Sequence, residues 1–200
     1  MKTNLIVILA LLCSCAKQHV KTDIITADHV FISAQQPPLF VRYLIAKGHQ
    51  YCDLSSYVPA SYANLKFSVQ FDSSAIYQCS DPVNQLDINK LYGFSDNNSD
   101  HHSYSARFGW RWSNGALRLF GYTYNNSMRE SKELGIVTIG AVNDCAIKVT
   151  PHNYIFTLNG SVDSMSREST TPVAIGYKLY PYFGGDEVSP HDIQIWIREN

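Results

Sequence analysis

The stretch SARFGWRWSNGALRLFGYTY, residues 105–124, contains two alternating runs that are joined by Asn114-Gly115. Asn-Gly readily adopts the positive φ angles of a type I′ turn, so the two runs are predicted to form an antiparallel hairpin. If these two residues form the loop, Ser113 pairs with Ala116 and the register of the whole hairpin is fixed. The apolar side chains of one face are then Phe108, Trp110, Trp112, Leu117 and Leu119. We expect this face to lie in the core.

The opposite face of the hairpin combines arginine with aromatic rings. Its arginine and aromatic residues are Arg107, Arg111, Arg118, Phe120, Tyr122 and Tyr124. The register places Arg111 opposite Arg118, so these two cations need a carboxylate partner from the protein or from a ligand. Aromatic rings stack on sugars, and guanidinium groups bind carboxylate or hydroxyl groups. We therefore predict that these six residues bind carbohydrate, with an acidic polysaccharide as the favoured class. The alternative is that a loop or sheet edge covers this face, with Phe120 shielding Gly109.

Further strand patterns flank the hairpin on both sides. They are LFVRYLIA (39–46), LKFSVQF (65–71), KLYGF (90–94), IVTIG (136–140), AIKVT (146–150), NYIFTL (153–158), YKLYPYF (177–183) and DIQIWI (192–197). No run of ten or more residues has the pattern of an amphipathic helix. Many strands without helices between them predict an all-β antiparallel sandwich or barrel, here a single domain over residues 39–200.

The first residues, MKTNLIVILALLCSCAKQ, have the pattern of an export signal. The apolar run is too short to span a bilayer, and Leu12-Cys13-Ser14-Cys15 resembles the bacterial lipobox. We expect a signal peptide over residues 1–14, lipid such as palmitate on Cys15, and a tether over residues 15–38. The resemblance implies a lipoprotein of the bacterial outer membrane or cell surface, since Ala16 is not the aspartate of inner-membrane retention. The alternative is an ordinary signal peptide with two incidental cysteines.

The composition excludes one class of partner. The formal net charge is −1, and only 16% of residues are charged. Nucleic-acid binding calls for a basic surface, so no nucleic-acid partner is expected. Contact with a membrane is expected only through the lipid at the N-terminus.

Three cysteines follow the signal, at positions 52, 79 and 145. Disulfides persist outside the cytoplasm, so one bridge and one free thiol are expected. We favour a bridge between Cys52 and Cys79, although the spacing does not fix the pairing.

We expect no metal or cofactor. Cysteine and histidine do not occur at zinc-ligand spacing, and neighbouring side chains on an extended chain point apart, which argues against His101 and His102 as joint ligands. A calcium loop is the alternative, because Asp96, Asn98 and Asp100 offer oxygen atoms at alternate positions.

The segment YKLYPYFGGDEVSPHDIQIWI, residues 177–197, holds Asp186, Glu187, His191 and Asp192 between two strand patterns. These side chains could form an acid/base or metal site. Two glycines and a proline favour a reversal of the chain instead, so we interpret the segment as a closing hairpin with Asp186 and Glu187 as solvated loop tips.

The order of motifs resembles a known fold family. Lys90, Leu91 and Gly93 match a Lys-Leu-x-Gly strand, and Ser105, Arg107, Trp110 and Arg111 approach a Ser-x-Arg-x-x-Trp-Arg strand. These features, followed by a Tyr-rich strand, resemble the concanavalin-like jelly-roll group of polysaccharide lyases, glucanases and LamG-like lectin domains. The end of the chain is similar to that of small lipoproteins of Bacteroidetes-type bacteria. The alginate-lyase branch has a Tyr-Phe-Lys pattern, where this chain has Tyr182, Phe183 and Gly184.

Carbohydrate binding without catalysis is the reading that these observations favour. No GxSxG, HExxH or P-loop signature is present. A polysaccharide lyase or glycoside hydrolase of the same fold is the first alternative, and the resemblance makes a lyase the preferred enzyme. A non-catalytic envelope or adhesion protein is the second alternative, and it predicts a covered or apolar sheet face.

Overall fold

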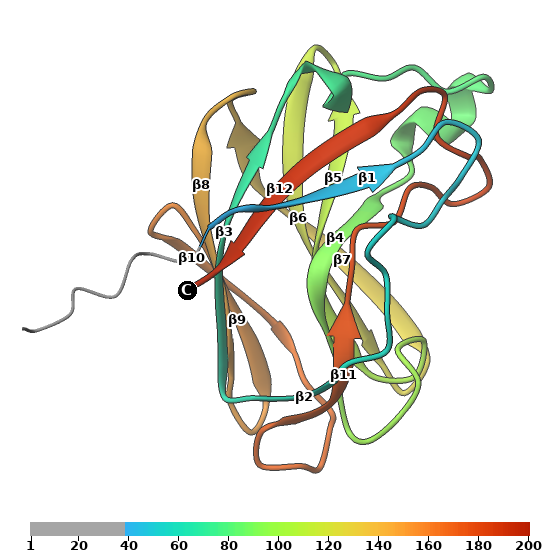
Figure 1. The fold of residues 1–200 in the computed structure, drawn as a ribbon. Coiled ribbons are helices and arrows are strands. Elements are labelled where there is room, and N and C mark those ends of the chain that lie inside the picture. The colour runs from blue at the N-terminus through green and yellow to red at the C-terminus, as the bar shows by residue number, and fades with distance from the viewer. Residues whose placement is uncertain (1–38) are drawn as a thin grey trace, which may run out of the picture. The chain divides into compact units, whose positions relative to one another are not determined.

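Twelve strands and two short 3-10 segments make up the part of the chain that the computed structural model describes, residues 39–200 (Figure 1). The first sheet contains, in spatial order, β1 (Val41–Ile45), β12 (Ile193–Glu199), β3 (Asn64–Phe71), β8 (Val142–Val149), β9 (Asn153–Leu158) and β10 (Ser161–Ser166). The second contains β2 (Pro59–Tyr62), β11 (Ala174–Leu179), β4 (Asn89–Ser95), β5 (Ser105–Ser113), β6 (Ala116–Asn125) and β7 (Met128–Val137). The 3-10 segments are η1 (Ser73–Ala75) and η2 (Pro82–Leu86).

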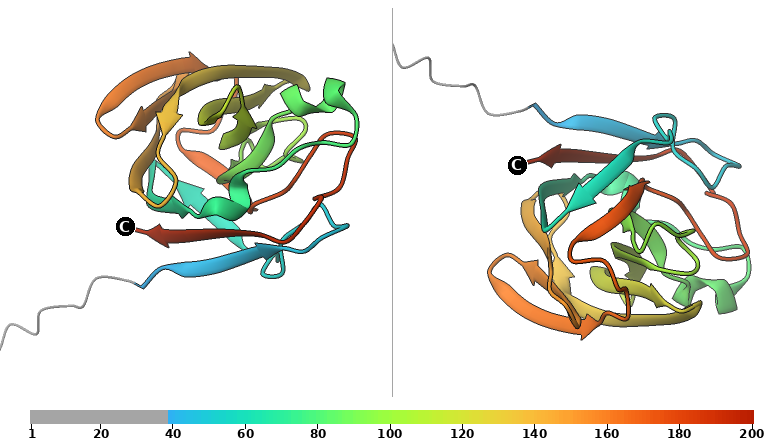
Figure 2. Two further views of the ribbon diagram at one scale, coloured as in Figure 1. Left: turned by 90° about the horizontal axis from the view of Figure 1, so that it is seen from above. Right: turned by 90° about the horizontal axis from the view of Figure 1, so that it is seen from below.

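All strand pairs are antiparallel, and strands from distant parts of the sequence pair with one another. β1 pairs with β12 over five residues, and the two strands lie side by side in the views from above and below (Figure 2). Aromatic and branched side chains of both sheets fill the space between them, including Phe67, Phe71, Trp110 and Phe156, all fully buried. The predicted all-β antiparallel sandwich is confirmed. Within residues 39–200, no helix has the length and apolar character needed to cross a membrane.

The central hairpin of β5 and β6 has the predicted register. Ser113 pairs with Ala116, and Asn114 and Gly115 have φ angles of 54° and 69°. The apolar face lies in the core as expected, except that Trp112 is only partly buried. The turn chemistry and the alternation are both local, so the sequence alone determines this pair.

The strand β7 starts eight residues earlier than its apolar pattern suggests. It includes the charged run Arg129 to Glu133, whose side chains are exposed, and it forms the edge of the second sheet. An edge strand with solvent on both faces shows no alternation of apolar and polar residues, which explains why the pattern predicted only its end. The short strand β2 was missed for a similar reason, since none of its side chains is buried.

The predicted closing hairpin is wrong. β11 belongs to the second sheet and β12 to the first, so the segment between them crosses from one sheet to the other. Glu187 is not a free loop tip, because its carboxylate accepts hydrogen bonds from the Ser80 and Asp81 amides at 2.8 and 2.7 Å. Asp192 accepts from the Lys47 amide at 2.8 Å. The acidic side chains therefore fasten the crossover to neighbouring loops.

The predicted bridge between Cys52 and Cys79 is absent from the structure, where these two residues and Cys145 are buried free thiols. Cys52 pairs through its backbone with Ile45 beside β1. Cys79 lies in the connection between η1 and η2, where its amide donates to Gln85. The thiols of Cys52 and Cys79 are therefore held by different segments of the chain. Burial raises the pKa of each thiol to about 11.

Candidate functional site

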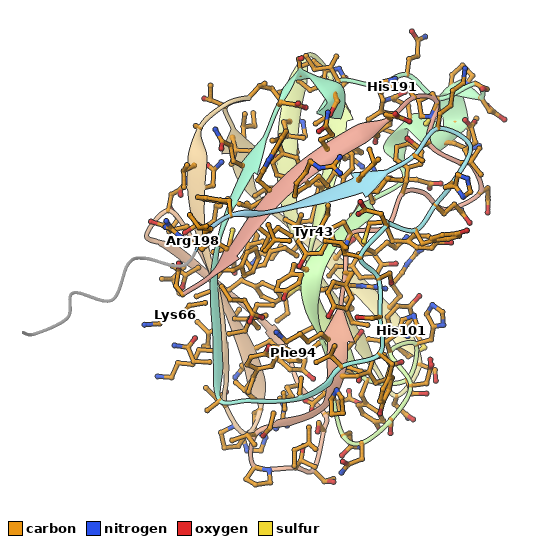
Figure 3. All side chains as sticks on the ribbon, in the orientation of Figure 1. Tyr43, Lys66, Phe94, His101, His191 and Arg198 are labelled. Carbon is orange, nitrogen blue, oxygen red and sulfur yellow. The ribbon has the colours of Figure 1, made fainter. Side chains whose placement is uncertain are left out.

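A groove crosses the face of the second sheet that points away from the core. Its larger cavity, of about 570 Å³, is lined by the connection that carries Tyr51 and Tyr57, by His101 and His102, and by residues of the 177–185 segment. A second cavity of about 260 Å³ is lined by Arg111, Tyr122 and Arg129, among others. Lys90 and Gly185 line both cavities, so the two meet there. His101 lies on the side of the molecule formed by the second sheet, away from Lys66 on the first (Figure 3).

Arg107 on β5 lies in the floor of the larger cavity and is only 5% exposed. No carboxylate within residues 39–200 forms an ion pair with its guanidinium, and its Nε has no hydrogen-bond partner there. The ring of Tyr122 lies 5.1 Å from the guanidinium carbon, an arrangement that favours a cation. Burial lowers the pKa of Arg107, yet a guanidinium stays charged at neutral pH. The groove thus has a buried positive charge in its floor.

Lys90 adds a second cation at the meeting point of the two cavities. Its ammonium donates to the Gly184 carbonyl at 2.6 Å and lies 5.5 Å from the centre of the Tyr122 ring. Burial, together with the nearby charges of Arg107 and Arg129, lowers the pKa of Lys90 to about 8. An anion in the groove would reverse this effect by favouring the charged form.

Tyrosine rings form one wall of the larger cavity. Tyr57 is 75% exposed, and its ring lies 5.2 Å from that of Tyr177 on β11. Tyr51 is 59% exposed, and its backbone pairs with Tyr182. Exposed rings beside a groove provide flat apolar surfaces with a polar edge.

Carboxylates are scarce along the groove. Of the described residues that line the two cavities, Asp87 alone carries a carboxyl group. Lys178 also lines the larger cavity, but its ammonium is paired with Glu199 at 2.8 Å. The lining therefore carries an excess of positive charge, from Lys90 and Arg107 in particular.

The turn after β4 brings His101 and His102 together at the rim of the groove. Their ring centroids are 4.2 Å apart, and the His101 Nδ1 lies 2.9 Å from the Tyr177 hydroxyl. The expectation that these two histidines point apart is wrong, because the chain turns here instead of running extended. Burial lowers the pKa of His101 to about 4, and Arg107 contributes in the same direction.

A fully buried ion pair holds this turn in place. The Asp96 carboxylate accepts from the Arg167 Nε at 2.8 Å and from the Tyr154 hydroxyl at 2.7 Å. The Ser99 amide donates to the Asp96 carbonyl at 3.0 Å. Since the Asp96 carboxylate is already engaged by Arg167 and Tyr154, the calcium loop of Asp96, Asn98 and Asp100, which was the alternative to a domain without metal, would lack its first ligand.

Comparisons with known proteins give the fold and nothing finer. No family model matches the chain, and no curated protein matches its sequence. Among solved structures, the alginate lyase AlyC3 matches with a TM-score of 0.56 and 8% identity, over 80% of this chain and 74% of that one. The laminarinase catalytic domain of Thermotoga maritima has a TM-score of 0.50 and 8% identity, over 80% and 75% of the two chains. A family 16 endo-glucanase from Bacteroides ovatus has a TM-score of 0.50 and 6% identity, over 82% and 81%.

The chain has the concanavalin-like jelly-roll fold. The resemblance expected from the strand motifs is confirmed at the level of this fold. At identities below 10% the likeness carries no residue roles, so the jelly-roll groove has to be interpreted from its own side chains.

The six arginine and aromatic residues predicted from the hairpin do not share one environment on the jelly-roll sheet. Arg107 lines the larger cavity, and Arg111 and Tyr122 line the smaller one. Phe120 is buried, with the Arg111 guanidinium 4.8 Å from its ring centre. The alternative of a covered face therefore holds for this part of the sheet, where Ile88 also packs against Gly109.

The two remaining residues lie outside the lining of both cavities. Arg118 pairs with Glu133 of β7 at 2.8 Å, which is the protein carboxylate that its position opposite Arg111 required. Tyr124 is partly buried, with its ring 5.4 Å from that of His102.

Several groove residues were not predicted from sequence, namely Lys90, Tyr57, Arg129, Tyr177 and Tyr182. Lys90 carried a sequence signal as part of the Lys-Leu-x-Gly motif, and Tyr182 carried one in the partial match to the Tyr-Phe-Lys pattern.

Proposed function

We propose that this jelly-roll domain binds an acidic polysaccharide in the groove of the second sheet. The observation that carries the proposal is Arg107, a nearly buried cation with no carboxylate partner within residues 39–200. A buried charge without a partner is unfavourable, so a position like this is best explained by an anion that arrives from outside.

Other groups along the groove fit a polymer with repeated negative charges. Arg107 lines the larger cavity, Lys90 lies where the two cavities meet, and Arg111 and Arg129 line the smaller one, so cations occur along the whole groove. The exposed Tyr51 and Tyr57 offer rings on which the apolar faces of sugar units can stack. Charge and stacking together favour an acidic polysaccharide over a neutral one.

The proposal is tested by affinity electrophoresis and calorimetry with polyuronate oligosaccharides and with a neutral β-glucan as comparison. Arg107→Met and Lys90→Met are expected to weaken binding to the polyuronate at least tenfold. Arg118→Met is the matched control, since this cation is already paired with a carboxylate and lies outside the lining of both cavities, and it should bind like the wild type. Absence of binding by the wild type, or equal loss in the control, would contradict the proposal.

A polysaccharide lyase is the second candidate, and the surroundings of Arg107 favour it over a glycoside hydrolase. A lyase needs a cation that neutralises the uronate carboxylate and a nearby proton acceptor, and both Arg107 and His101 line the larger cavity. Glycoside hydrolysis ordinarily needs a pair of carboxylates, whereas Asp87 is the single one among the described lining residues. Incubation with polyuronate and detection of unsaturated products by ultraviolet absorbance separates binding from lyase activity.

An adhesion protein with a covered or apolar sheet face fits the groove less well, because cations and exposed tyrosines line it. We further propose that the domain is displayed at the bacterial outer membrane or cell surface by lipid on Cys15. The signal peptide, this cysteine and the tether lie outside the described residues. Metabolic labelling with an alkyne palmitate analogue tests the anchor, and Cys15→Ala should abolish the label and release the protein from the membrane fraction.

A further inference from the structure

Three potential metal ligands converge in the turn at the rim of the groove. The Asp100 carboxylate lies between two imidazoles, with Oδ2 3.6 Å from the His101 Nδ1 and Oδ1 3.7 Å from the His102 Nδ1. One ligand atom from each residue lies within 4.8 Å of the other two. Two ligands on one tetrahedral zinc ion are about 3.4 Å apart, as follows from bond lengths of about 2.1 Å. Small rotations of these side chains would therefore bring all three onto one ion.

The backbone already fixes the positions of these residues. The Asp100 carbonyl accepts from the Ser103 and Tyr104 amides at 2.9 and 3.0 Å, which closes the turn. The Asp100 Oδ1 accepts from the His102 amide at 2.8 Å. A site whose ligands are held before the ion arrives loses little conformational entropy on binding.

Tyr177 on β11 supplies an outer contact to two of the ligands. Its hydroxyl accepts from the His101 amide at 3.1 Å, and it lies 2.9 Å from the His101 Nδ1 and 3.3 Å from the Asp100 Oδ2. The single hydroxyl proton can serve one of these two acceptors at a time. If an ion takes the Nδ1 lone pair, the proton can move to the carboxylate, so no hydrogen bond of Tyr177 is lost.

We propose that Asp100, His101 and His102 form a binding site for one divalent transition-metal ion of the zinc class. Two imidazoles and one carboxylate are a donor set that suits Zn²⁺ and its neighbours and is too poor in oxygen for Ca²⁺. Asp100 and His102 have side chains that are 61% and 66% exposed, so an ion can reach them from solvent. Arg107 lines the same cavity, and the Asp100 carboxylate offsets the repulsion between its positive charge and a metal ion. This proposal differs from our expectation from sequence that the domain carries no metal.

The ion would retain open coordination positions. Three protein ligands leave at least one position for water or for an oxygen of another molecule. Because His101 and His102 both line the larger cavity, these positions lie beside the groove. Binding of the ion by these three side chains does not require a polysaccharide in the groove.

The test is a titration of the full chain with Zn²⁺ in competition with a chromophoric chelator, followed by Co²⁺ as a spectroscopic probe. The wild type should take up one equivalent in this site and give a visible Co²⁺ spectrum with imidazole ligation. His101→Ala and His102→Ala should each weaken Zn²⁺ binding at least about tenfold. Asp100→Asn should also weaken it, and this variant keeps the size of the side chain in case an alanine variant fails to fold. His152→Ala, which removes an exposed histidine outside the turn, should leave binding unchanged.

Two outcomes would overturn the proposal. One is the absence of saturable Zn²⁺ uptake by the wild type. The other is uptake that is unchanged in a folded His101→Ala/His102→Ala double variant, since the ion would then bind elsewhere, for example on cysteine. Zn²⁺ uptake is measured without polysaccharide, so failure here is distinct from failure of polysaccharide binding.

Discussion

Replacing Arg107 with methionine is expected to stabilise the ligand-free protein while removing its affinity for acidic polysaccharide. The guanidinium is 5% exposed and its Nε has no partner within the described residues. Methionine keeps a similar unbranched shape and needs no hydrogen bond. A site selected for stability would show the opposite response.

The size of the effect follows from two opposing contributions. Replacing a buried ion pair by well-packed apolar residues is often neutral or stabilising by about 1–4 kcal/mol, and Arg107 lacks even the attraction to a carboxylate that such a pair retains. The variant also loses the contact of the cation with the Tyr122 ring, 5.1 Å away, which is worth about 1–2 kcal/mol when desolvated. The net expectation is a gain of about 1–2 kcal/mol in the free energy of unfolding. For a domain of this size this corresponds to an increase in Tm of roughly 2–8 °C.

The assay is urea unfolding followed by tryptophan fluorescence, with and without polyuronate. Arg118→Met is the matched control, because Arg118 is partly exposed and paired with Glu133, so its loss should cost about 0–1 kcal/mol. Polyuronate should raise the unfolding midpoint of the wild type and of Arg118→Met, but not of Arg107→Met. A destabilisation of Arg107→Met by more than about 1 kcal/mol would show that the cation is a structural element, and our reasoning about the groove would fail.

Three further predictions concern pH and packing. Because the pKa of Lys90 is about 8 in the fold and near 10.5 in a free chain, the unfolded state binds more protons between these values, so stability should rise with pH across this window. Affinity for polyanion should fall over the same range, and Lys90→Met should remove both trends in urea midpoints and calorimetry. Asp96→Asn should lower the free energy of unfolding by about 3–5 kcal/mol, because it leaves Arg167 buried without its anion. A decrease of less than about 1 kcal/mol, measured by thermal unfolding, would refute this. Gly93→Ala should lower the free energy of unfolding by about 2–3 kcal/mol, since a Cβ there would lie 2.2 Å from the Ala106 carbonyl oxygen. If the variant unfolds at the wild-type Tm, this close packing is wrong.

The parts of the fold that could be predicted are those that local chemistry determines. Asn114-Gly115 and the alternation around it were enough to give the register of β5 and β6. Most of strand β7 was not predicted, because its charged residues are exposed on a sheet edge. Glu133, the partner of Arg118, lies on this strand and was therefore not predicted either. The crossover after β11 was not predicted, because glycine and proline indicate that the chain changes direction but not which sheet the next strand joins.

The candidate site was predicted only where a single hairpin builds it. Arg107 and Tyr122 come from that hairpin, whereas Tyr57 and Tyr177 reach the groove through pairing of β2 and β11, strands more than 100 residues apart. His101 and His102 were misjudged because their geometry depends on a turn anchored by Asp96, and the buried partner of Asp96 lies 71 residues away. Contacts of this range are set by tertiary packing, and a pattern of neighbouring residues does not contain them.

The charged strand β7 also bears on how copies of this domain can crowd together. An open sheet edge is a template onto which a neighbouring molecule can add a strand, which is a common route to aggregation. The outer edge of β7 presents Arg129, Glu130, Lys132 and Glu133 in close succession, and Lys132 is fastened to Asp163 of β10 at 2.6 Å. Pairing with a second copy would partly remove this row of charges from water, so the edge resists strand addition. Copies of this domain at high local concentration would therefore stay separate, with their grooves free.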